Sequence, residues 1–489
     1  MILVASVFCS FLAISNQSLW IDEAHSAVKA IQPTWNKFVY EFTADAGSDM
    51  QMPGYMATLW AWEKLTGPSE YALRMLNAWL FLFSQIIILY CLRAPRPIRI
   101  WFAICALLSP FVWYYLDEAR PYILQYFASV LVVTSLCNIA FFPSPQKITR
   151  DLLYFLTGAI VLCAASLLGV IFAGIYGCIF VVLIWEHWTL FKKVRISGVL
   201  VGSLLLSALL LALLGIYYAW TLTQGARASA LGNTTVANLI FVFYEFFGLA
   251  GLGPDRNLLR SVGPKALLAY AIPLGIALLI YALTILLGIR AAFRSRAFSC
   301  KPVLFFIAGS AIMLGGIYLF GVALHFRILG RHFIPLFPLF LLAFAWILAS
   351  LIRSDRLSGG LVICLLASWL ISDVRLRFSG LYAKDDYRTA AGYVKDASPD
   401  KNRIWWAADL DAARYYGLNL QNPDTGITSP TLPTISPSKS LISSRERPNL
   451  IILSKGDIFD AKGALKDYLQ KEDYQLIKTF PGFTIWQEK

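Results

Sequence analysis

Long hydrophobic runs constrain this chain more than any other feature of its sequence. Eleven of them lie near residues 1–18, 71–92, 98–116, 121–142, 152–168, 169–190, 196–220, 265–289, 302–324, 333–352 and 358–374. A helix needs about 20 apolar residues to cross a bilayer, so the stretch from 152 to 190 is divided into two spans at "SLLG". Since 58% of the residues are apolar and only 15% are charged, we expect a polytopic α-helical membrane protein with about eleven spans.

The basic residues between the runs predict the orientation of the chain. Five alternate connections, "RAPRPIR", "PSPQKITR", "KKVR", "IRAAFRSRAFSCK" and "RSDR", together carry fourteen Lys or Arg residues. Short loops with this excess remain in the cytoplasm. The outer loops are then 19–70, 117–120, 221–264 and 325–332, and the carboxyl-terminal tail also lies outside. This topology explains the net charge of +13 without a nucleic-acid partner.

The tail has the composition of a small water-soluble domain. "RIWWAADL" and "PNLIILSKG" are typical of buried strands, and "TAAGYVKDA" and "AKGALKDYL" of helices. "YQLIKTF" and "FTIWQEK" are expected to be the closing strands. The chain is therefore divided into a transmembrane module, 1–375, with interfacial helices in its first outer loop, and an extracytoplasmic α/β domain, 376–489.

Charged and aromatic residues gather in the predicted outer loops. Each group has a simple structural explanation. The acids in "SLWIDEAHS" can cap a helix, the "DEAR" turn can close on itself through an ion pair, and the arginines of "HFRILGRHFIPLFP" can anchor a helix end at the interface. The residues considered are Asp22, Glu23 and His25 in the first loop, Glu118 and Arg120 in the second, and Arg327 and Arg331 in the fourth, with the aromatic Tyr55, Tyr115 and Tyr122.

Together these residue types favour one kind of chemistry. A carboxylate near the bilayer can act as a general base or bind a cation, and an arginine guanidinium suits phosphate oxygens. Aromatic rings at the same level can pack against a sugar or an isoprenoid chain. This combination indicates transfer of a sugar from a polyprenyl-phosphate carrier to an acceptor outside the cytoplasm.

Four motifs also carry a family resemblance. "SLWIDEAHS", "MPGYMATLWAWEKLTGPSEYALRMLNAW", "SPFVWYYLDEARPYIL" and "GRHFIPLFPLFLL" resemble bacterial glycosyltransferases with the GT-C fold, in the group related to protein O-mannosyltransferases and lipid A aminoarabinose transferases. The resemblance implies a polytopic inner-membrane enzyme that uses lipid-phosphate sugars. Its active site and carboxyl terminus would face the extracytoplasmic side.

The resemblance also implies roles for individual residues. Asp22 would be the catalytic base with Glu23 beside it, Glu118 and Arg120 would lie near the donor phosphate, and Arg331 would also contact that phosphate. Many relatives have a His-Pro-Pro stretch followed by Leu and Tyr, whereas this chain reads "QMPGY" at 51–55. Any substrate contact made by that His in relatives is therefore not carried over.

Two other functions and one cofactor stay open at this point. An O-antigen polymerase or ligase would use a diphosphate-linked glycan, and it usually has a large late outer loop rich in Arg and His. A transporter of lipid-linked sugars would place polar residues inside the spans. A divalent cation, Mg²⁺ or Mn²⁺, would be held by Asp22 and Glu118 if the enzyme needs one. The donor sugar and the acceptor, whether a glycan, a lipid or a protein, are not determined by these residues.

Overall fold

The computed structural model describes residues 1–44, 47–192, 198–224, 233–294, 300–352, 356–397, 404–418, 420, 434–435 and 447–489. The chain forms two compact units. The helical unit comprises Met1–Ser15, Val39–Trp62 and Arg74–Tyr382, and the sheet-containing unit comprises Asn16–Phe38, Glu63–Leu73 and Ala383–Lys489. Two segments of the first predicted outer loop therefore fold together with the tail, which the division at residue 375 did not anticipate.

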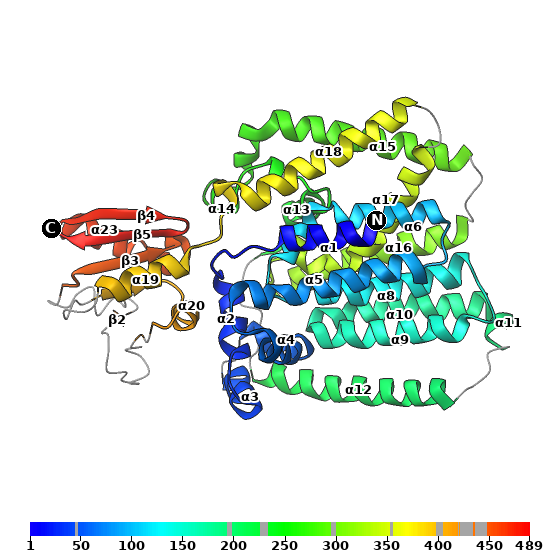
Figure 1. Cartoon of the computed structure of the whole chain (residues 1–489), viewed down its shortest axis with the longest axis horizontal. Coiled ribbons are helices and arrows are strands. Elements are labelled where there is room, and N and C mark those ends of the chain that lie inside the picture. Colours follow the sequence, from blue (N-terminus) through cyan, green and yellow to red (C-terminus); the bar gives the residue numbers. More distant parts are fainter. Residues whose placement is uncertain are drawn as a thin grey trace. The chain divides into compact units, whose positions relative to one another are not determined.

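The helical unit is built from long apolar helices (Figure 1). In chain order its elements are α1 (Ile2–Ala13), η1 (Ser48–Gln51), α4 (Pro53–Thr66), α5 (Glu70–Ile86), η2 (Ile87–Cys91), α6 (Arg96–Leu107), α7 (Pro110–Leu116), α8 (Tyr122–Phe141), α9 (Ile148–Ala165), α10 (Leu167–Glu186), α11 (Trp188–Phe191), α12 (Gly198–Thr223), α13 (Val236–Phe246), η3 (Ala250–Leu252), α14 (Arg256–Val262), η4 (Gly263–Tyr270), α15 (Ala271–Arg294), α16 (Cys300–Ala323), η5 (Gly330–Leu336), α17 (Phe337–Leu351), α18 (Arg356–Phe378) and η6 (Gly380–Tyr382). The first residues of α5 and the last of α4 belong to the other unit.

Among the described residues, nine helices are long and apolar enough to cross a membrane. A tenth span is formed if α6 and α7, which are bent by 54° at a short break, count as one. The bend has a local cause, because Ser109 accepts a hydrogen bond from the Val112 amide and Pro110 starts the new helix. These ten segments match the predicted runs from 71 onward, so the chain is a polytopic helical membrane protein, as expected.

The first predicted span differs from the structure. α1 has only 12 residues, and Ile14 already has an extended backbone. Polar groups explain this early end, since the backbone amide and hydroxyl of Ser15 both donate to Asp117, at 2.5 and 2.8 Å. The hydrogen bonds that would have continued the helix are replaced by bonds to a side chain.

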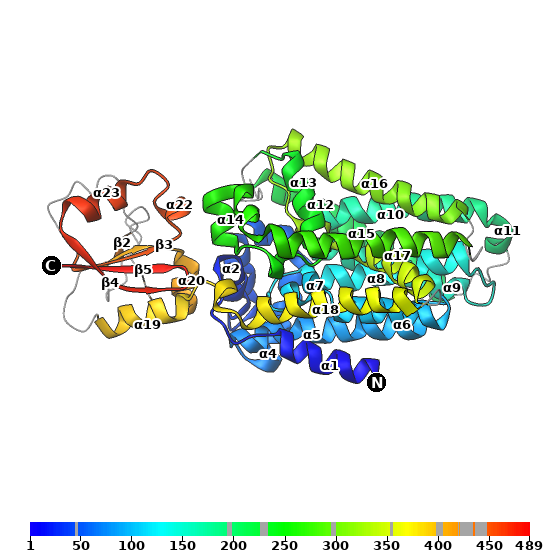
Figure 2. The same ribbon diagram turned by 90° about the horizontal axis from the view of Figure 1, so that it is seen from above.

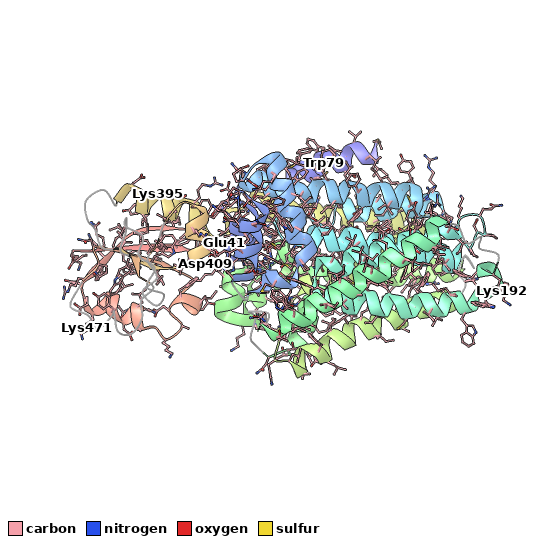
Figure 3. All side chains as sticks on the ribbon, turned by 90° about the horizontal axis from the view of Figure 1, so that it is seen from below. Glu41, Trp79, Lys192, Lys395, Asp409 and Lys471 are labelled. Atoms are coloured by element: carbon pink, nitrogen blue, oxygen red, sulfur yellow. The ribbon has the colours of Figure 1, made fainter. Side chains whose placement is uncertain are left out.

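Packing in the helical unit centres on α8, whose apolar window is 94% buried. It lies beside α9 and α10 (Figures 1 and 2), and α17 packs against α6, α8 and α15. The predicted break in 152–190 is confirmed, because Ser166 separates α9 from α10 and accepts a hydrogen bond from the Gly169 amide. By contrast Trp79 on α5 points outward and is 43% exposed (Figure 3), as a lipid-facing side chain would be.

Gly158 allows the close approach of α9 to α8, and we expect its substitution to separate the two helices. A Cβ atom at this position would lie 2.7 Å from the Ala128 carbonyl oxygen and 2.8 Å from a Val132 methyl group. Gly158→Leu should lower stability by about 1–3 kcal/mol, the usual cost of overpacking. Gly174→Leu on α10 is the control, because nothing lies within 4 Å of its Cβ position. Thermal unfolding in detergent measures both variants, and equal midpoints would contradict this prediction.

The sheet-containing unit has a five-stranded sheet in the order β2-β1-β3-β5-β4; Figure 2 labels β2, β3, β4 and β5. Its strands are β1 (Ile404–Ala407), β2 (Thr434–Ile435), β3 (Leu450–Ser454), β4 (Tyr474–Phe480) and β5 (Phe483–Glu488). β1 is parallel to β2 and β3, whereas β5 is antiparallel to β3 and β4. The predicted strands in "RIWWAADL", "PNLIILSKG", "YQLIKTF" and "FTIWQEK" are all confirmed.

Helices complete this unit. They are α2 (Ile21–Ala30), the start of α3 (Trp35–Ala44), α19 (Tyr387–Ala397), α20 (Leu410–Tyr415), α22 (Gly456–Phe459) and α23 (Ala464–Lys471). Leu465, Tyr468 and Leu469 of α23 pack on Trp405 and Ile451 of the sheet. At the β4–β5 hairpin Gly482 has a φ of 76°, a conformation that glycine adopts without strain.

Candidate active site

Side chains from four predicted outer loops meet within the helical unit. Arg120 of the second loop pairs with Asp49 of the first. Glu118 of the second loop faces Arg256 of the third, and Glu245 of the third loop binds the backbone of Gly330 in the fourth. These contacts place the four loops at the same end of the helices, as the alternation of basic connections requires.

The Arg120–Asp49 pair is the most enclosed of these contacts. The two side chains are only 6% and 2% exposed, and Arg120 Nη1 lies 2.7 Å from Asp49 Oδ1. Asp49 lies in η1, whose Met50 carbonyl oxygen accepts a hydrogen bond from the Tyr217 hydroxyl of α12. A guanidinium presents five N–H donors in a planar fork, a geometry that suits the oxygens of a carboxylate or a phosphate.

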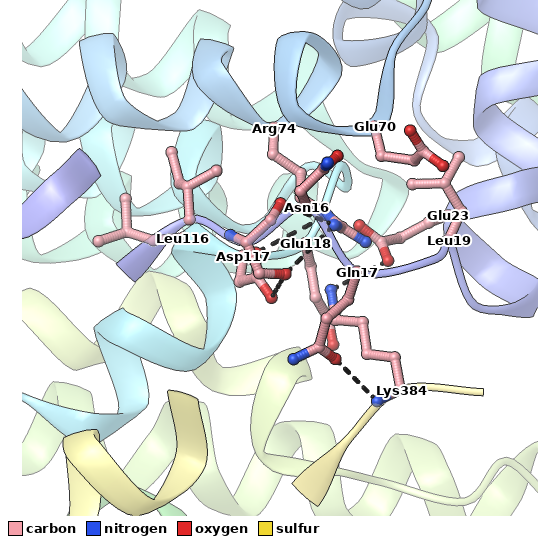
Figure 4. A network of polar contacts seen from close by, with 12 residues as sticks. Asn16, Gln17, Leu19, Glu23, Glu70, Arg74, Leu116, Asp117, Glu118 and Lys384 are labelled. Carbon is pink, nitrogen blue, oxygen red and sulfur yellow. Dashed lines mark hydrogen bonds and ion pairs between the residues drawn. The ribbon is translucent and has the colours of Figure 1, made fainter. Parts of the chain in front are cut away.

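Asp117 and Asn77 fix the loop that carries Glu118 and Arg120. Asp117 accepts both hydrogen bonds from Ser15 described above, and Arg74 Nε lies 3.8 Å from one of its oxygens (Figure 4). Asn77 Nδ2 donates to the Glu118 carbonyl oxygen at 2.6 Å. The backbone of this turn is thus held from α5 and from the end of α1, which preorganises the side chains that it carries.

Arg256 is the exposed cation of the cluster. Its Nη1 lies 3.9 Å from Glu118 Oε1, and its guanidinium lies 4.2 Å from the centre of the Tyr114 ring. The Arg256 side chain is 48% exposed, whereas that of Glu118 is 1% exposed. An exposed guanidinium that is oriented by a buried carboxylate and an aromatic face is well placed to receive an anionic ligand.

Glu245 joins the third loop to the fourth. Its Oε2 atom is fully enclosed and has no hydrogen-bond partner among the described residues, while the Gly330 amide donates to the carboxylate. Burial raises the pKa of Glu245, and the positive charges of Arg256 and Arg331 oppose this rise. Glu245 therefore lies close enough to Arg256 and Arg331 for their charges to act on its carboxyl group.

Gly330 has to be a glycine for this contact, and we expect Gly330→Ala to disrupt it. The new Cβ atom would overlap Glu245 Oε2 and lie 2.8 Å from its Cδ atom. Loss of about 1–3 kcal/mol of stability is expected, as for other overpacked sites.

Two further variants test this explanation by thermal unfolding. Gly316→Ala on α16 meets nothing within 4 Å and should be neutral or stabilising by up to about 1 kcal/mol, because alanine favours a helix. Glu245→Ala combined with Gly330→Ala should recover the unfolding midpoint. If the double variant were no more stable than Gly330→Ala, the overlap with Glu245 would not be the cause.

The predicted aromatic contacts have different surroundings. Tyr115 and Tyr122 are buried, and their ring centres lie 4.8 Å apart. Tyr115 also packs against Phe111 and Tyr114. Tyr55, on α4, is fully buried. The rings of Tyr115 and Tyr122 belong to the hydrophobic core of the helical unit, next to the turn that carries Glu118.

The fourth loop presents its two arginines differently. Arg331 lies at the start of η5 and is partly buried, next to the glycine that Glu245 binds. Arg327 is exposed. Of the two, Arg331 belongs to the charged cluster.

Asp22, Glu23 and His25 lie on α2 in the sheet-containing unit. Glu23 is fully buried, and Lys384 Nζ lies 3.0 Å from its Oε2. His25 Nε2 lies 2.8 Å from Asp409 Oδ2. Asp22 is partly buried in the first turn of the helix. The predicted meeting of Asp22 with Glu118 and Arg120 joins residues of two units and stays a prediction.

Sequence reasoning did not select Arg256 and Glu245. The available signal was weak: Glu245 is the single charged residue of the apolar helix α13, and Arg256 follows it in the same outer loop, next to Asp255. Asp49 was not among the selected residues either. No group of three or more His, Cys, Asp or Glu residues within the described ranges is arranged to hold a metal ion, and the need for a cation stays open.

Solved structures provide the decisive comparison for the fold. The structure of ArnT from Cupriavidus metallidurans in the apo state matches with a TM-score of 0.55 at 11% sequence identity, over 99% of this chain and 96% of that one. The structure of the same ArnT bound to undecaprenyl phosphate matches with a TM-score of 0.51 at 10% identity, over 99% and 97%. The chain has a GT-C fold. No protein-family model matches the sequence, and no curated protein sequence is detectably similar to it.

The GT-C fold confirms the resemblance that the four motifs indicated. ArnT is a lipid A aminoarabinose transferase, which is one of the two groups named from those motifs. Only about one residue in ten is identical between this chain and ArnT. The prediction therefore depended on hydropathy and on a few loop residues.

Proposed function

We propose that this chain is an inverting glycosyltransferase of the bacterial inner membrane. It would transfer a sugar from a polyprenyl-phosphate donor to an acceptor on the extracytoplasmic side. The observation that carries the proposal is a GT-C fold whose outer loops bring three arginines and three carboxylates together, namely Arg120, Arg256, Arg331, Asp49, Glu118 and Glu245. The ArnT structure bound to undecaprenyl phosphate supports a lipid of this class as partner.

The proposed reaction exchanges one bond to the anomeric carbon for another. Asp22 removes the proton of an acceptor hydroxyl, and the acceptor oxygen attacks the anomeric carbon from the face opposite the phosphate. The bond between that carbon and the phosphate oxygen breaks, and its electron pair leaves with the polyprenyl phosphate. Arginine stabilises the growing negative charge on the phosphate, an effect that is strongest where water is excluded.

The arrangement of charges supports this division of roles. Arg120 and Arg256 each have a carboxylate partner that orients the guanidinium. Arg331 directly follows Gly330, whose backbone amide donates a hydrogen bond to the Glu245 carboxylate. A phosphate monoester presents several oxygens, and planar guanidinium groups bind such oxygens in pairs. Glu118 would keep Arg256 directed toward the donor.

The lipid product distinguishes this proposal from its alternatives. Purified protein in nanodiscs is incubated with a panel of undecaprenyl-phosphate hexoses and pentoses and an extract of envelope acceptors, and lipids are followed by mass spectrometry. Release of undecaprenyl monophosphate from one donor is expected. Turnover that starts only from diphosphate-linked glycans would favour a polymerase or ligase. Movement of unchanged lipid across the bilayer would favour a transporter.

One observation bears on the transporter alternative. Asp373 of α18 is fully buried inside a candidate span, and neither carboxylate oxygen has a hydrogen-bond partner among the described residues. Acids inside the membrane often mark transport pathways. However, the concentration of charge at the loop end around Arg120 and Glu118 suits chemistry on a lipid headgroup better, and the enzyme stays the preferred proposal.

A further inference from the structure

Residues of the carboxyl-terminal tail contact the segment around α2 at three successive points, through hydrogen bonds and ion pairs. Tyr416 contacts residues just before the helix, Lys384 contacts Glu23 in its first turn, and Asp409 contacts His25 one half-turn later. All of these residues belong to one compact unit. The contacts come from three separate places in the tail, so they fix both the position and the rotation of α2.

The first contact fixes the chain as it enters the helix. The Leu19 amide donates to the Tyr416 hydroxyl oxygen at 2.8 Å, and that hydroxyl also lies 3.0 Å from Glu70 Oε1. Glu70 in turn is paired with Arg388 of α19. The hydroxyl is therefore held by a carboxylate that the tail itself orients.

The second contact is a buried ion pair. Lys384 and Glu23 are 12% and 0% exposed, and the Lys384 amide donates to Gln17 Oε1 at 2.9 Å (Figure 4). Glu23 also lies 3.5 Å from the Trp20 amide and so closes the amino-terminal capping box of α2. A buried carboxylate without its cation would be costly, so Lys384 specifies how the first turn of α2 is placed.

The third contact is made by Asp409, whose two carboxylate oxygens have different partners. Asp409 Oδ1 accepts the Ala412 amide and caps α20, while Oδ2 lies 2.8 Å from His25 Nε2. Asp411 of the same helix lies 3.8 Å from that His25 nitrogen. Because its first oxygen is fixed by the helix cap, Asp409 presents the second oxygen to His25 in one orientation.

We propose that the carboxyl-terminal domain is a positioning element of the active site and that Lys384 is its main positioning residue. The inference rests on the proposed function, in which Asp22 is the base. Asp22 immediately precedes Glu23 and lies in the same helical turn. The rotation that Lys384 imposes through Glu23 therefore sets the direction of the Asp22 carboxylate, and Tyr416 and Asp409 hold the two flanks.

Steady-state kinetics of the full chain in nanodiscs tests this role. With the undecaprenyl-phosphate sugar that the wild type accepts, Lys384→Met should lower kcat by about 10²-fold, the effect of a misplacement of about 1 Å. The KM for the lipid donor should stay unchanged, because Lys384 does not bind it in this proposal. Lys384→Arg should recover most of kcat. Lys395→Met on α19 is the matched control, since Lys395 is exposed (Figure 3).

A second variant keeps the test valid if Lys384→Met does not fold. Tyr416→Phe removes one hydroxyl and leaves the ring, and it should also lower kcat at constant donor KM. If folded Lys384→Met had the same kcat as the wild type, the positioning role would be overturned. A variant in which only the KM for the donor rises would overturn it as well. Absence of turnover by the wild type with every donor would instead refute the proposed function. In that case the backbone amides of residues 18–26 should still exchange hydrogen faster in Lys384→Met than in the wild type. If their exchange rates were unchanged, the claim that Lys384 fixes the position of α2 would also be wrong.

Discussion

Asp22→Asn is expected to lower turnover by about 10²–10⁴-fold, the range that a positioned general base contributes. The amide has nearly the same shape as the carboxylate but cannot accept the proton of the acceptor hydroxyl. Donor binding should be retained, because the arginines of the cluster are unchanged. The measurement is the single-turnover rate of undecaprenyl phosphate release, with donor binding followed separately.

The helix-capping explanation of Asp22 makes a different prediction for the same variant. Asp22 lies in the first turn of α2, where loss of a negative charge lowers stability by about 0.3–1 kcal/mol. On this explanation the turnover rate would not change. Asp467→Asn is the control, because Asp467 lies in the first turn of α23 and is exposed. If Asp22→Asn turned over at the wild-type rate, Asp22 would be a capping residue and the assignment of the base would be wrong.

Arg120→Met is expected to have the largest effect on stability. It leaves the carboxylate of Asp49, which is 2% exposed, without its cation at 2.7 Å. Removal of one partner from such a buried pair costs about 3–5 kcal/mol. The measurement is the unfolding midpoint in detergent, calibrated with a denaturant series.

A double variant separates stability from catalysis at this pair. Asp49→Asn combined with Arg120→Met removes both charges, and most of the lost stability should return because no uncompensated charge remains buried. Turnover should stay low, since the phosphate would have lost one of its proposed cations. Recovery of full activity by the stable double variant would show that Arg120 is a structural residue.

The fold could be predicted mainly from the hydropathy of the sequence. Spans such as α8 and α17 are continuous apolar runs, so their approximate limits follow from bilayer thickness alone. The break at Ser166 was also predictable, because the stretch around it exceeds one span. α1 ends early because Asp117, more than one hundred residues away in the chain, binds the Ser15 backbone, and no local pattern reports such a contact.

The candidate site was predictable only in part. Glu118 and Arg120 stand in a charged turn between two apolar runs, which is a strong signal in a membrane protein. Glu245 lies in an apolar helix and Arg256 is one of several charged residues in the same loop. Their importance depends on the approach of Gly330 and Tyr114, which only the folded chain reveals. The same is true of Lys384, since nothing in "YAKDDYRTA" indicates a buried partner on α2.

The most direct test of the central claim is a cryo-EM structure of the full chain with bound undecaprenyl phosphate. The proposed enzyme requires the phosphate oxygens to lie within hydrogen-bond distance, about 3 Å, of at least one guanidinium among Arg120, Arg256 and Arg331. The carboxylates of Asp22 and Glu118 should border the same lipid-accessible pocket on the extracytoplasmic side. A phosphate bound elsewhere, or Asp22 facing a different compartment from Glu118, would contradict the account.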